Sequence, residues 1–136
     1  EVQATISPIE YLDLQLGYTL TDTLDRETGN RLVLRPVHRG TAQLSFEYED
    51  TNATVRSSFV GDSLFRAGDP LIPTFEEDEL TPAYVTLDIR VEHRLFDNFT
   101  AFVGAENLFD VGEPRYLPTR PRSFYAGISA RYESAD

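Results

Sequence analysis

The segment Leu117–Tyr132, LPTRPRSFYAGISARY, contains the clearest single indication of the fold class. From Ser123 to Tyr132 the side chains alternate between two sets. One set is Phe124, Ala126, Ile128, Ala130 and Tyr132, and the other is Ser123, Tyr125, Gly127, Ser129 and Arg131. Successive side chains of a β-strand point to opposite faces, so this period of two predicts a strand with one apolar and one polar face. The alternation alone leaves open whether the apolar face meets lipid or a protein interior.

Six earlier segments alternate in the same way and predict six more strands: residues 2–6, 11–21, 40–48, 53–62, 85–95 and 99–106. We expect Pro8 to end the first strand, because proline has no N–H for the ladder. The predicted short connections are 7–10, 49–52 and 96–98, and the predicted long connections are 22–35, 63–82 and 107–121.

The lengths of the connections alternate regularly along the chain, short and then long, three times over. In an up-and-down sheet all the short turns then lie at one end and all the long loops at the other. This asymmetry is typical of outer-membrane barrels, which have short turns on the periplasmic side. Five aromatic residues fall at the predicted short-turn end, where an interfacial girdle would lie: Tyr11, Tyr48, Phe96, Phe99 and Tyr132.

Composition limits the classes that the chain can belong to. Its 136 residues fit one domain, and no segment approaches the roughly 18 apolar residues of a membrane helix, so a strand barrel is the expected way to cross a bilayer. The chain has no cysteine, which excludes disulfides and thiolate metal sites. Its 23 acidic and 12 basic residues give a net charge of −11, which argues against nucleic acid as a partner. No basic and apolar leader is present, so we expect any export signal to be removed or to lie outside this sequence.

Two segments near the carboxyl end resemble a known family. Glu106, Asn107, Leu108, Phe109 and Asp110 read ENLFD, which is similar to the (E/N)NLFD motif of TonB-dependent outer-membrane receptors. In that family a loop and a last strand of the type RxFYxGxxxxF follow, and the matching residues here are Arg122, Phe124, Tyr125, Gly127 and Tyr132. Residues 34–39, LRPVHR, resemble the family's LPxRPxHR segment.

The resemblance implies an all-β, antiparallel up-and-down transmembrane barrel, of which residues 1–136 would be the carboxyl-terminal segment. About seven strands of a barrel of about 22 would lie in this chain, without the plug domain. The sequence departs from the family in three ways. The plug domain, the energy-coupling box and about fifteen strands are expected outside this sequence, and seven is an odd number of strands for a bacterial barrel. Tyr132 stands where a terminal Phe is usual and is followed by residues 133–136, and residues 110–114, DVGEP, replace a basic, tyrosine-rich loop start.

The resemblance also implies a function, a cellular localisation and a set of partners. The family imports scarce ligands such as ferric siderophores, cobalamin or glycans across the bacterial outer membrane. The expected partners are membrane lipid and lipopolysaccharide, the rest of the barrel and its plug domain, and the TonB energy-coupling protein through the amino-terminal part. No cofactor, metal or catalytic activity is expected, because the sequence has no nucleophile elbow, phosphate loop or His/Ser/acid set.

In a barrel of this kind the two faces would have different roles. The predicted lipid-facing residues are Leu12, Leu14, Leu16, Leu44, Phe46, Val85, Leu87, Ile89, Val91 and Ile128. The predicted lumen-facing residues are Arg56, Asp88, Arg90, Glu92, Glu106 and Arg131, which would contact the plug or a passing ligand or simply pair with one another across strands. The candidate outer ligand contacts on the long loops are Arg26, Arg31, Arg66, Arg115 and Tyr116.

The histidines and the acidic run 76–79 do not form an expected metal or catalytic site. We expect His38 and His93 near opposite ends of the strands, of order 25 Å apart, which is too far for one site. The run 76–79 lacks the spacing of a calcium loop and is interpreted as a solvated loop.

One alternative places the apolar faces inward, in a soluble lipocalin-type barrel that encloses a small apolar ligand. An outer-membrane barrel enzyme is a third hypothesis, and it would need catalytic partners from outside this chain.

Overall fold

The computed structural model describes residues 1–21, 36–65, 79–112 and 119–131, and these residues contain strands and no helix. The strands are β1 (Val2–Ile9), β2 (Leu12–Leu20), β3 (His38–Tyr48), β4 (Thr51–Val60), β5 (Ser63–Phe65), β6 (Glu79–Thr81), β7 (Tyr84–Phe96), β8 (Phe99–Glu106) and β9 (Ser123–Ala130). Within the described ranges no helix is long and apolar enough to span a membrane.

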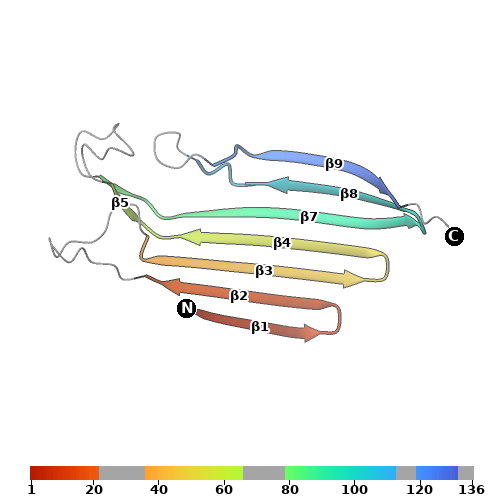
Figure 1. Ribbon diagram of the computed structural model, residues 1–136, viewed down its shortest axis with the longest axis horizontal. Coiled ribbons are helices and arrows are strands. Elements are labelled where there is room, and N and C mark those ends of the chain that lie inside the picture. Colours follow the sequence, from red (N-terminus) through yellow and green to blue (C-terminus); the bar gives the residue numbers. More distant parts are fainter. Residues whose placement is uncertain (22–35, 66–78, 113–118, 132–136) are drawn as a thin grey trace.

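Seven strands form one antiparallel sheet in the order β1-β2-β3-β4-β7-β8-β9, so each of its strands lies beside the one next to it along the chain (Figure 1). The strands β5 and β6 pair separately as a short two-stranded sheet at the long-loop end. The predicted alternation of short turns and long connections is confirmed, and the meander follows from it. This is the all-β, up-and-down arrangement that the period-two pattern predicts.

The pairing register carries the apolar face across the whole sheet. Residues that pair directly lie on the same face, and one continuous row joins all seven strands: Ile6, Leu14, Leu44, Val55, Ile89, Ala105 and Phe124. The neighbouring row on the other face is Asp13, Ser45, Thr54, Arg90, Gly104 and Tyr125. The sheet therefore has one apolar face and one mainly polar face, as alternation requires.

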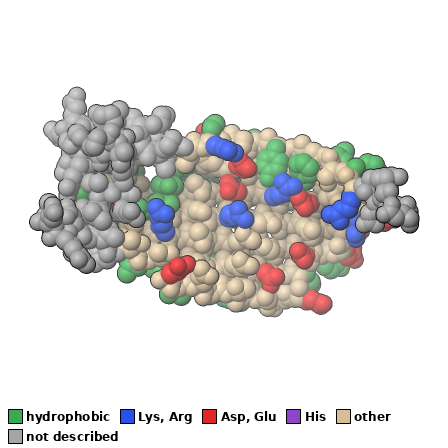
Figure 2. Space-filling view, in the orientation of Figure 1, with side chains coloured by type: hydrophobic (Ala, Val, Ile, Leu, Met, Phe, Trp, Pro, Cys, Tyr) green, Lys and Arg blue, Asp and Glu red, His purple; other side chains and the backbone are tan. Residues whose placement is uncertain are grey.

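Nothing in the described chain covers the apolar face. Ala105 is the only buried hydrophobic residue among the described ones, and large apolar side chains such as Ile128 and Val103 are 68% and 55% exposed. The other face carries charged side chains, and in the view of Figure 2 acidic and basic groups are spread across the sheet. The lipocalin alternative is therefore wrong for these residues, because it requires the leucines to be enclosed inside a closed barrel.

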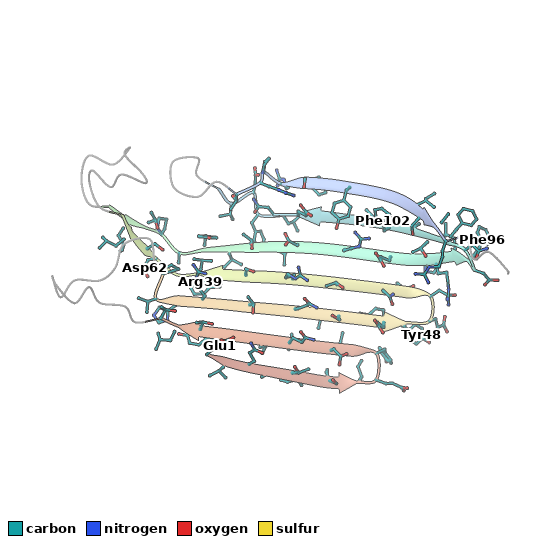
Figure 3. All side chains as sticks on the ribbon, in the orientation of Figure 1. Glu1, Arg39, Tyr48, Asp62, Phe96 and Phe102 are labelled. Carbon is teal, nitrogen blue, oxygen red and sulfur yellow. The ribbon has the colours of Figure 1, made fainter. Side chains whose placement is uncertain are left out.

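The height of the apolar face fits a membrane. The 11 residues of β3 span about 33 Å, which at a tilt of roughly 40° gives a height of about 25 Å, the height of the apolar band of outer-membrane barrels. Aromatic rings gather at its short-turn end, where Tyr11 packs edge-on against Tyr48 and Phe46, with centroids 5.4 and 5.9 Å away. Phe96 packs against Phe99 at the next hairpin, and Figure 3 labels Tyr48 and Phe96 at this end. The predicted aromatic grouping is confirmed for the described residues, and Tyr132 lies outside them.

The prediction that Pro8 ends the first strand is wrong, because β1 continues to Ile9. The register shifts between the pairs Ile6–Leu14 and Ile9–Leu12, so Ser7 and Pro8 lie in an irregularity where the missing N–H of proline costs no regular ladder bond. Ser7 also donates a hydrogen bond to the Asp13 carboxylate at 2.5 Å.

Other boundaries differ from the prediction by a few residues. The β3–β4 turn contains only Glu49 and Asp50, since Tyr48 pairs with Thr51, and Glu49 adopts a left-handed φ of 49°. The β7–β8 turn likewise contains only Asp97 and Asn98. The strand predicted for 53–62 ends at Val60 and the last strand ends at Ala130.

The predicted connection 63–82 contains strand structure that its composition does not indicate. Its two ends pair as β5 and β6, where the buried Thr81 hydroxyl donates to the backbone oxygen of Ser63 at 3.2 Å. Three-residue strands are too short for a periodic signal, so the sequence pattern could not reveal them.

The two faces make opposite predictions for one substitution at adjacent positions. Leu44→Arg places a cation at the centre of the apolar face and should destabilise the lipid-embedded full-length barrel by about 2–4 kcal/mol. Ser45→Arg, on the polar face beside Asp13, should change stability by less than about 1 kcal/mol. Equilibrium unfolding in urea from lipid vesicles measures both, and equal costs would contradict the assignment of the faces.

Candidate functional site

The polar face brings the predicted lumen-facing charges together. Asp88 pairs in register with Arg56, and Arg90 and Glu92 follow Asp88 on the same face of β7. Glu106 lies opposite Ser123 on this face, and Arg131 shares a groove with Glu92 and Arg94 near the short turns. All six residues therefore share one face of the sheet, and the predicted lipid-facing residues share the other.

The charges on this face are only partly paired. Arg90 donates from Nε to Glu92 at 2.7 Å and forms an ion pair with it. Although Arg56 and Asp88 are register partners, the structure shows no ion pair between their side chains, and the Arg56 guanidinium donates to the Gln43 amide oxygen at 3.1 and 3.2 Å. These groups are exposed, so such pairs contribute little to stability.

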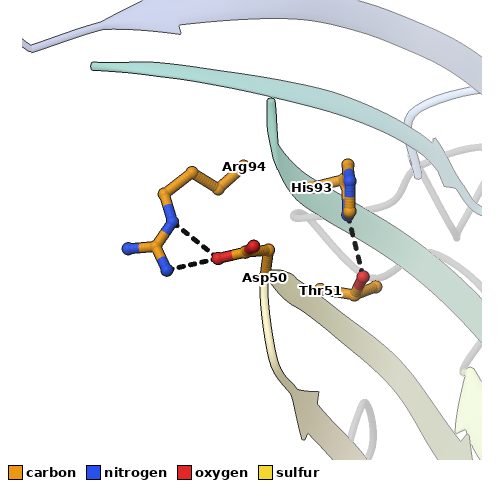
Figure 4. A network of polar contacts seen from close by, with 4 residues as sticks. All are labelled: Asp50, Thr51, His93 and Arg94. Atoms are coloured by element: carbon orange, nitrogen blue, oxygen red, sulfur yellow. Dashed lines mark hydrogen bonds and ion pairs between the residues drawn. The ribbon is translucent and has the colours of Figure 1, made fainter. Parts of the chain in front are cut away.

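Arg94 and His93 lie on opposite faces of β7 at the short-turn end, and each contacts the β3–β4 hairpin (Figure 4). Arg94 donates from Nε to the Asp50 carboxylate at 2.7 Å and forms an ion pair with it. On the opposite face, His93 Nδ1 lies 2.9 Å from the Thr51 hydroxyl. Asp50 and Thr51 come from one hairpin, so this pair of contacts fixes that hairpin against β7.

An arginine–aromatic cluster lies on the polar face between β7, β8 and β9. The guanidinium of Arg90 lies 4.7 Å from the centroid of the Phe102 ring and 5.8 Å from that of Tyr125. The Tyr125 ring covers Gly104 and the Phe102 ring covers Gly127, each glycine being the register partner of the residue above it. The reciprocal placement leaves no room for a side chain at either glycine.

The sequence analysis placed Phe102 and Tyr125 on the polar face but did not identify this cluster. An aromatic residue on an otherwise polar strand face, opposite a glycine on the next strand, is a signal that could have found it. Once the register is known, Arg90 lies in the same row as Gly104 and Tyr125.

Asn107, the second residue of the ENLFD segment, holds the end of β8. It is 7% exposed and has a left-handed φ of 48°, a conformation that asparagine tolerates better than most residues. Its backbone N–H donates to the Asp88 carboxylate at 2.8 Å, and its side-chain amide donates to the carbonyls of Val111 and Arg120, both at 2.8 Å. Its amide oxygen accepts from the Val111 N–H at 3.0 Å. The side chain of Asn107 thus ties the turn to the segment before β9, and its backbone N–H ties the turn to β7.

The rest of the segment completes this turn. Leu108 N–H donates to the Leu87 carbonyl, and Asp110, with a φ of 54°, donates its N–H to Asn107 and accepts from the Arg122 N–H at 2.9 Å. Phe109 is 58% exposed. We call residues 106–112 and 119–122 the Asn107 turn. It makes Asp88 a structural acceptor, which the prediction of a ligand-facing role had not included.

The histidines lie at opposite ends of the apolar face, as predicted. His38 begins β3, and the other end of β3, Tyr48, shares a row with His93, so about ten residue steps, or roughly 33 Å, separate the two levels. The described residues contain no group of three or more His, Cys, Asp or Glu side chains that could hold a metal ion.

The loop candidates Arg26, Arg31, Arg66, Arg115 and Tyr116 lie outside the described residues, as do 76–78 of the acidic run.

Comparison with known proteins gives a family and a set of similar folds. The family model described as TonB dependent receptor-like, beta-barrel, matches residues 1–108. No curated protein matches the chain.

Several solved structures are similar in fold. A mutant of the ferric enterobactin receptor PfeA from Pseudomonas aeruginosa aligns over 94% of this chain with a TM-score of 0.72 and 16% identity. The siderophore receptor PirA from Acinetobacter baumannii aligns over 90% with a TM-score of 0.70 and 18% identity. The ferripyoverdine receptor of the outer membrane of Pseudomonas aeruginosa aligns over 93% with a TM-score of 0.74 and 16% identity. The chain spans 21%, 20% and 18% of these proteins, about a fifth of their length.

The Asn107 turn predicts a local cost for one amide. Asn107→Ala removes three side-chain hydrogen bonds and places alanine at positive φ, so the free energy of unfolding should fall by about 2–4 kcal/mol. Hydrogen exchange of the full-length protein should show faster exchange in residues 107–112 and 119–123. Asn98→Ala, in the short β7–β8 turn, is the matched control and should leave these segments protected; unchanged exchange in both variants would show that the amide is dispensable.

The ring-covered glycines predict a second asymmetry. A Cβ at Gly104 would lie 2.4 Å from the Tyr125 ring and 2.8 Å from the Ile89 carbonyl, whereas at Gly40 its nearest neighbour would be 3.7 Å away. Gly104→Ala should therefore destabilise the barrel by about 1–3 kcal/mol, and Gly40→Ala should be nearly neutral. Thermal unfolding of both variants measures the difference, and a neutral Gly104→Ala would refute the ring-on-glycine packing.

Proposed function

The chain belongs to the TonB-dependent receptor β-barrel family, whose members are bacterial outer-membrane proteins, and from this premise we propose that residues 1–136 form the carboxyl-terminal part of the wall of a receptor that imports a siderophore-class ligand. The family match over residues 1–108 is the observation that carries the proposal. Ferric enterobactin, siderophore and ferripyoverdine receptors are among the proteins with a similar fold.

The edges of the sheet support a wall that continues on both sides. Within the described residues, β1 pairs only with β2 and β9 pairs only with β8, so the outer edge of each carries backbone groups without a ladder partner. Hydrocarbon does not tolerate such an edge, since each unsatisfied group costs several kcal/mol there. We therefore propose that further strands of the same barrel pair with both edges, as in a barrel of about 22 strands.

The polar face supports a lumen through which a polar ligand passes. The half of this face that lies between the level of Asp88 and the long loops is rich in amide and hydroxyl groups, among them Gln3, Gln15, Gln43, Thr41 and Thr86. Arg39 and Arg56 line the groove that these strands form together with one acidic side chain, Glu1, so positive side-chain charge is in excess there. Such a surface suits an anionic ligand with many oxygen atoms, a description that fits ferric siderophores better than neutral glycans.

The partners follow from the same placement. We propose that the plug domain fills the lumen against the charged residues of β7, that the TonB protein acts through the amino-terminal part of the receptor, and that Arg26, Arg31, Arg66, Arg115 and Tyr116 contact the ligand outside. The protein then works as a transporter without catalysis, and its ligand carries any metal as cargo.

Uptake by whole cells tests this function. Deletion of the full-length gene should abolish energy-dependent uptake of at least one radiolabelled ferric siderophore, and expression from a plasmid should restore it. Arg56→Gln should lower uptake at limiting ligand by about tenfold, which corresponds to the loss of one charge-assisted contact, while the amount of receptor in the membrane stays the same. Arg122→Gln also removes one arginine but lies outside the groove that contains Arg56, so this control variant should leave uptake unchanged.

Two outcomes would contradict the proposal. If deletion leaves the uptake of every ferric siderophore tested unchanged but abolishes growth on cobalamin or on an oligosaccharide, the ligand class is wrong. If the full-length protein does not fractionate with the outer membrane, the receptor role itself fails.

A further inference from the structure

The apolar face carries a groove that a smooth membrane wall would not require. It lies along the outer-loop half of β3, has a volume of about 300 Å³ and is lined almost entirely by apolar surface. Gly40 and Ala42 form its floor, and Ser57 of β4 extends the floor on one side. Small side chains at three adjacent positions thus create a depression between the larger apolar side chains of the neighbouring strands.

Large side chains form the walls of this groove. Tyr18 and Phe59 are the register partners of Gly40 on its two sides, and Leu16 is the partner of Ala42 on β2. The three side chains are 44%, 39% and 41% exposed, so they stand out from the sheet. On β3 the groove extends from Gly40 to Ala42, about 7 Å along the strand, and His38 lies just beyond its outer end.

The mouth of the groove holds a hydrogen-bond donor. His38 lies one step above Gly40 on the same face of β3, and its Nδ1 lies 2.6 Å from the Tyr18 hydroxyl. A neutral imidazole has one N–H and a phenol has one O–H. Whichever tautomer forms the contact, one of these two hydrogens is used between the rings and the other remains. Among the described residues neither group has a further hydrogen-bond partner, so the pair offers one donor to an oxygen at the membrane interface.

We propose that this groove binds one acyl chain of lipopolysaccharide, whose ester and phosphate oxygens accept the free hydrogen of the Tyr18–His38 pair. The inference rests on the proposed placement of this face in the outer membrane. The long loops lie at the outer side of such barrels, so the mouth of the groove is at the level of the outer-leaflet headgroups. An apolar trough with a single donor at its outer end matches a chain that is apolar along its length and oxygen-rich at its head.

Native mass spectrometry of the full-length receptor, purified in mild detergent and incubated with defined lipids, tests the proposal. The wild type should retain one lipopolysaccharide molecule. Gly40→Leu and Ala42→Leu should each reduce the affinity for this lipid by about tenfold, as expected for the displacement of roughly two methylene groups. A methyl group at Gly40 meets only ordinary contacts, so this position tolerates a side chain. The double variant with Tyr18→Phe and His38→Phe keeps apolar walls and should weaken retention of lipopolysaccharide through the loss of both hydrogens.

Ala126→Leu, which adds the same bulk on the apolar face of β9, should leave retention unchanged. Equal retention by the wild type and both groove-filling variants would overturn the proposal, and so would retention of phosphatidylethanolamine or phosphatidylglycerol in preference to lipopolysaccharide, or dimerisation through this face. Siderophore uptake is measured on the wild type and the same variants. A wild type that takes up siderophore normally but does not bind lipopolysaccharide would reject the groove proposal alone. A wild type that takes up no siderophore would reject the receptor function.

Discussion

The fold depends on the pairing of backbone N–H and C=O groups between neighbouring strands, combined with a side-chain period of two. Because register partners share a face, six antiparallel ladders are enough to join Ile6 on one edge to Phe124 on the other in a single apolar row. A slip of one residue in any ladder would move the apolar side chains of every strand beyond that ladder to the other face. The sheet has no second layer within the described residues, so the medium on each face takes the place of a core. An apolar face without a core is stable only in lipid or against another apolar surface.

The family segments have different physical roles in this arrangement. Asn107 acts through hydrogen bonds to three separate parts of the chain, and its position at the end of β8 explains why a short polar side chain that accepts positive φ is needed there. Tyr125 and Gly127 act through shape, since their side of β9 interlocks with Phe102 and Gly104 of β8. These residues fix the last two strands against β7. That packing is internal to the sheet, so the family motif reports on the wall of the barrel.

Much of the fold could be predicted from the sequence because alternation is a local signal. The seven long strands, their order, the division of faces and the one-sided short turns all follow from periodicity and turn residues such as Glu49 and Asp50. Pro8 was misjudged because a bulge can absorb a missing N–H, which only the register reveals. The strands β5 and β6 are too short to show a period. The contacts of Asn107 join residues up to 19 positions apart, and the Arg90 cluster needs three strands in register, so no local pattern encodes either of them. The direction of the apolar face came from the family resemblance, since alternation is the same in a soluble barrel.

The most direct test is a spin-label scan of β4, residues 51–60, in the full-length protein in lipid, which is simplified by the absence of cysteine from this chain. Each residue in turn is replaced by a spin-labelled cysteine, and its accessibility to oxygen, which concentrates in hydrocarbon, is compared with that to a water-soluble nickel complex. Oxygen accessibility should peak at Ala53, Val55, Ser57 and Phe59 and fall at Asn52, Thr54, Arg56 and Ser58. Low accessibility to both reagents at Val55 and Ser57 would mean that the apolar face is enclosed by protein, and a pattern of the opposite phase would mean that the other face meets lipid. Either result would contradict the account of the chain as a wall whose apolar face meets the membrane.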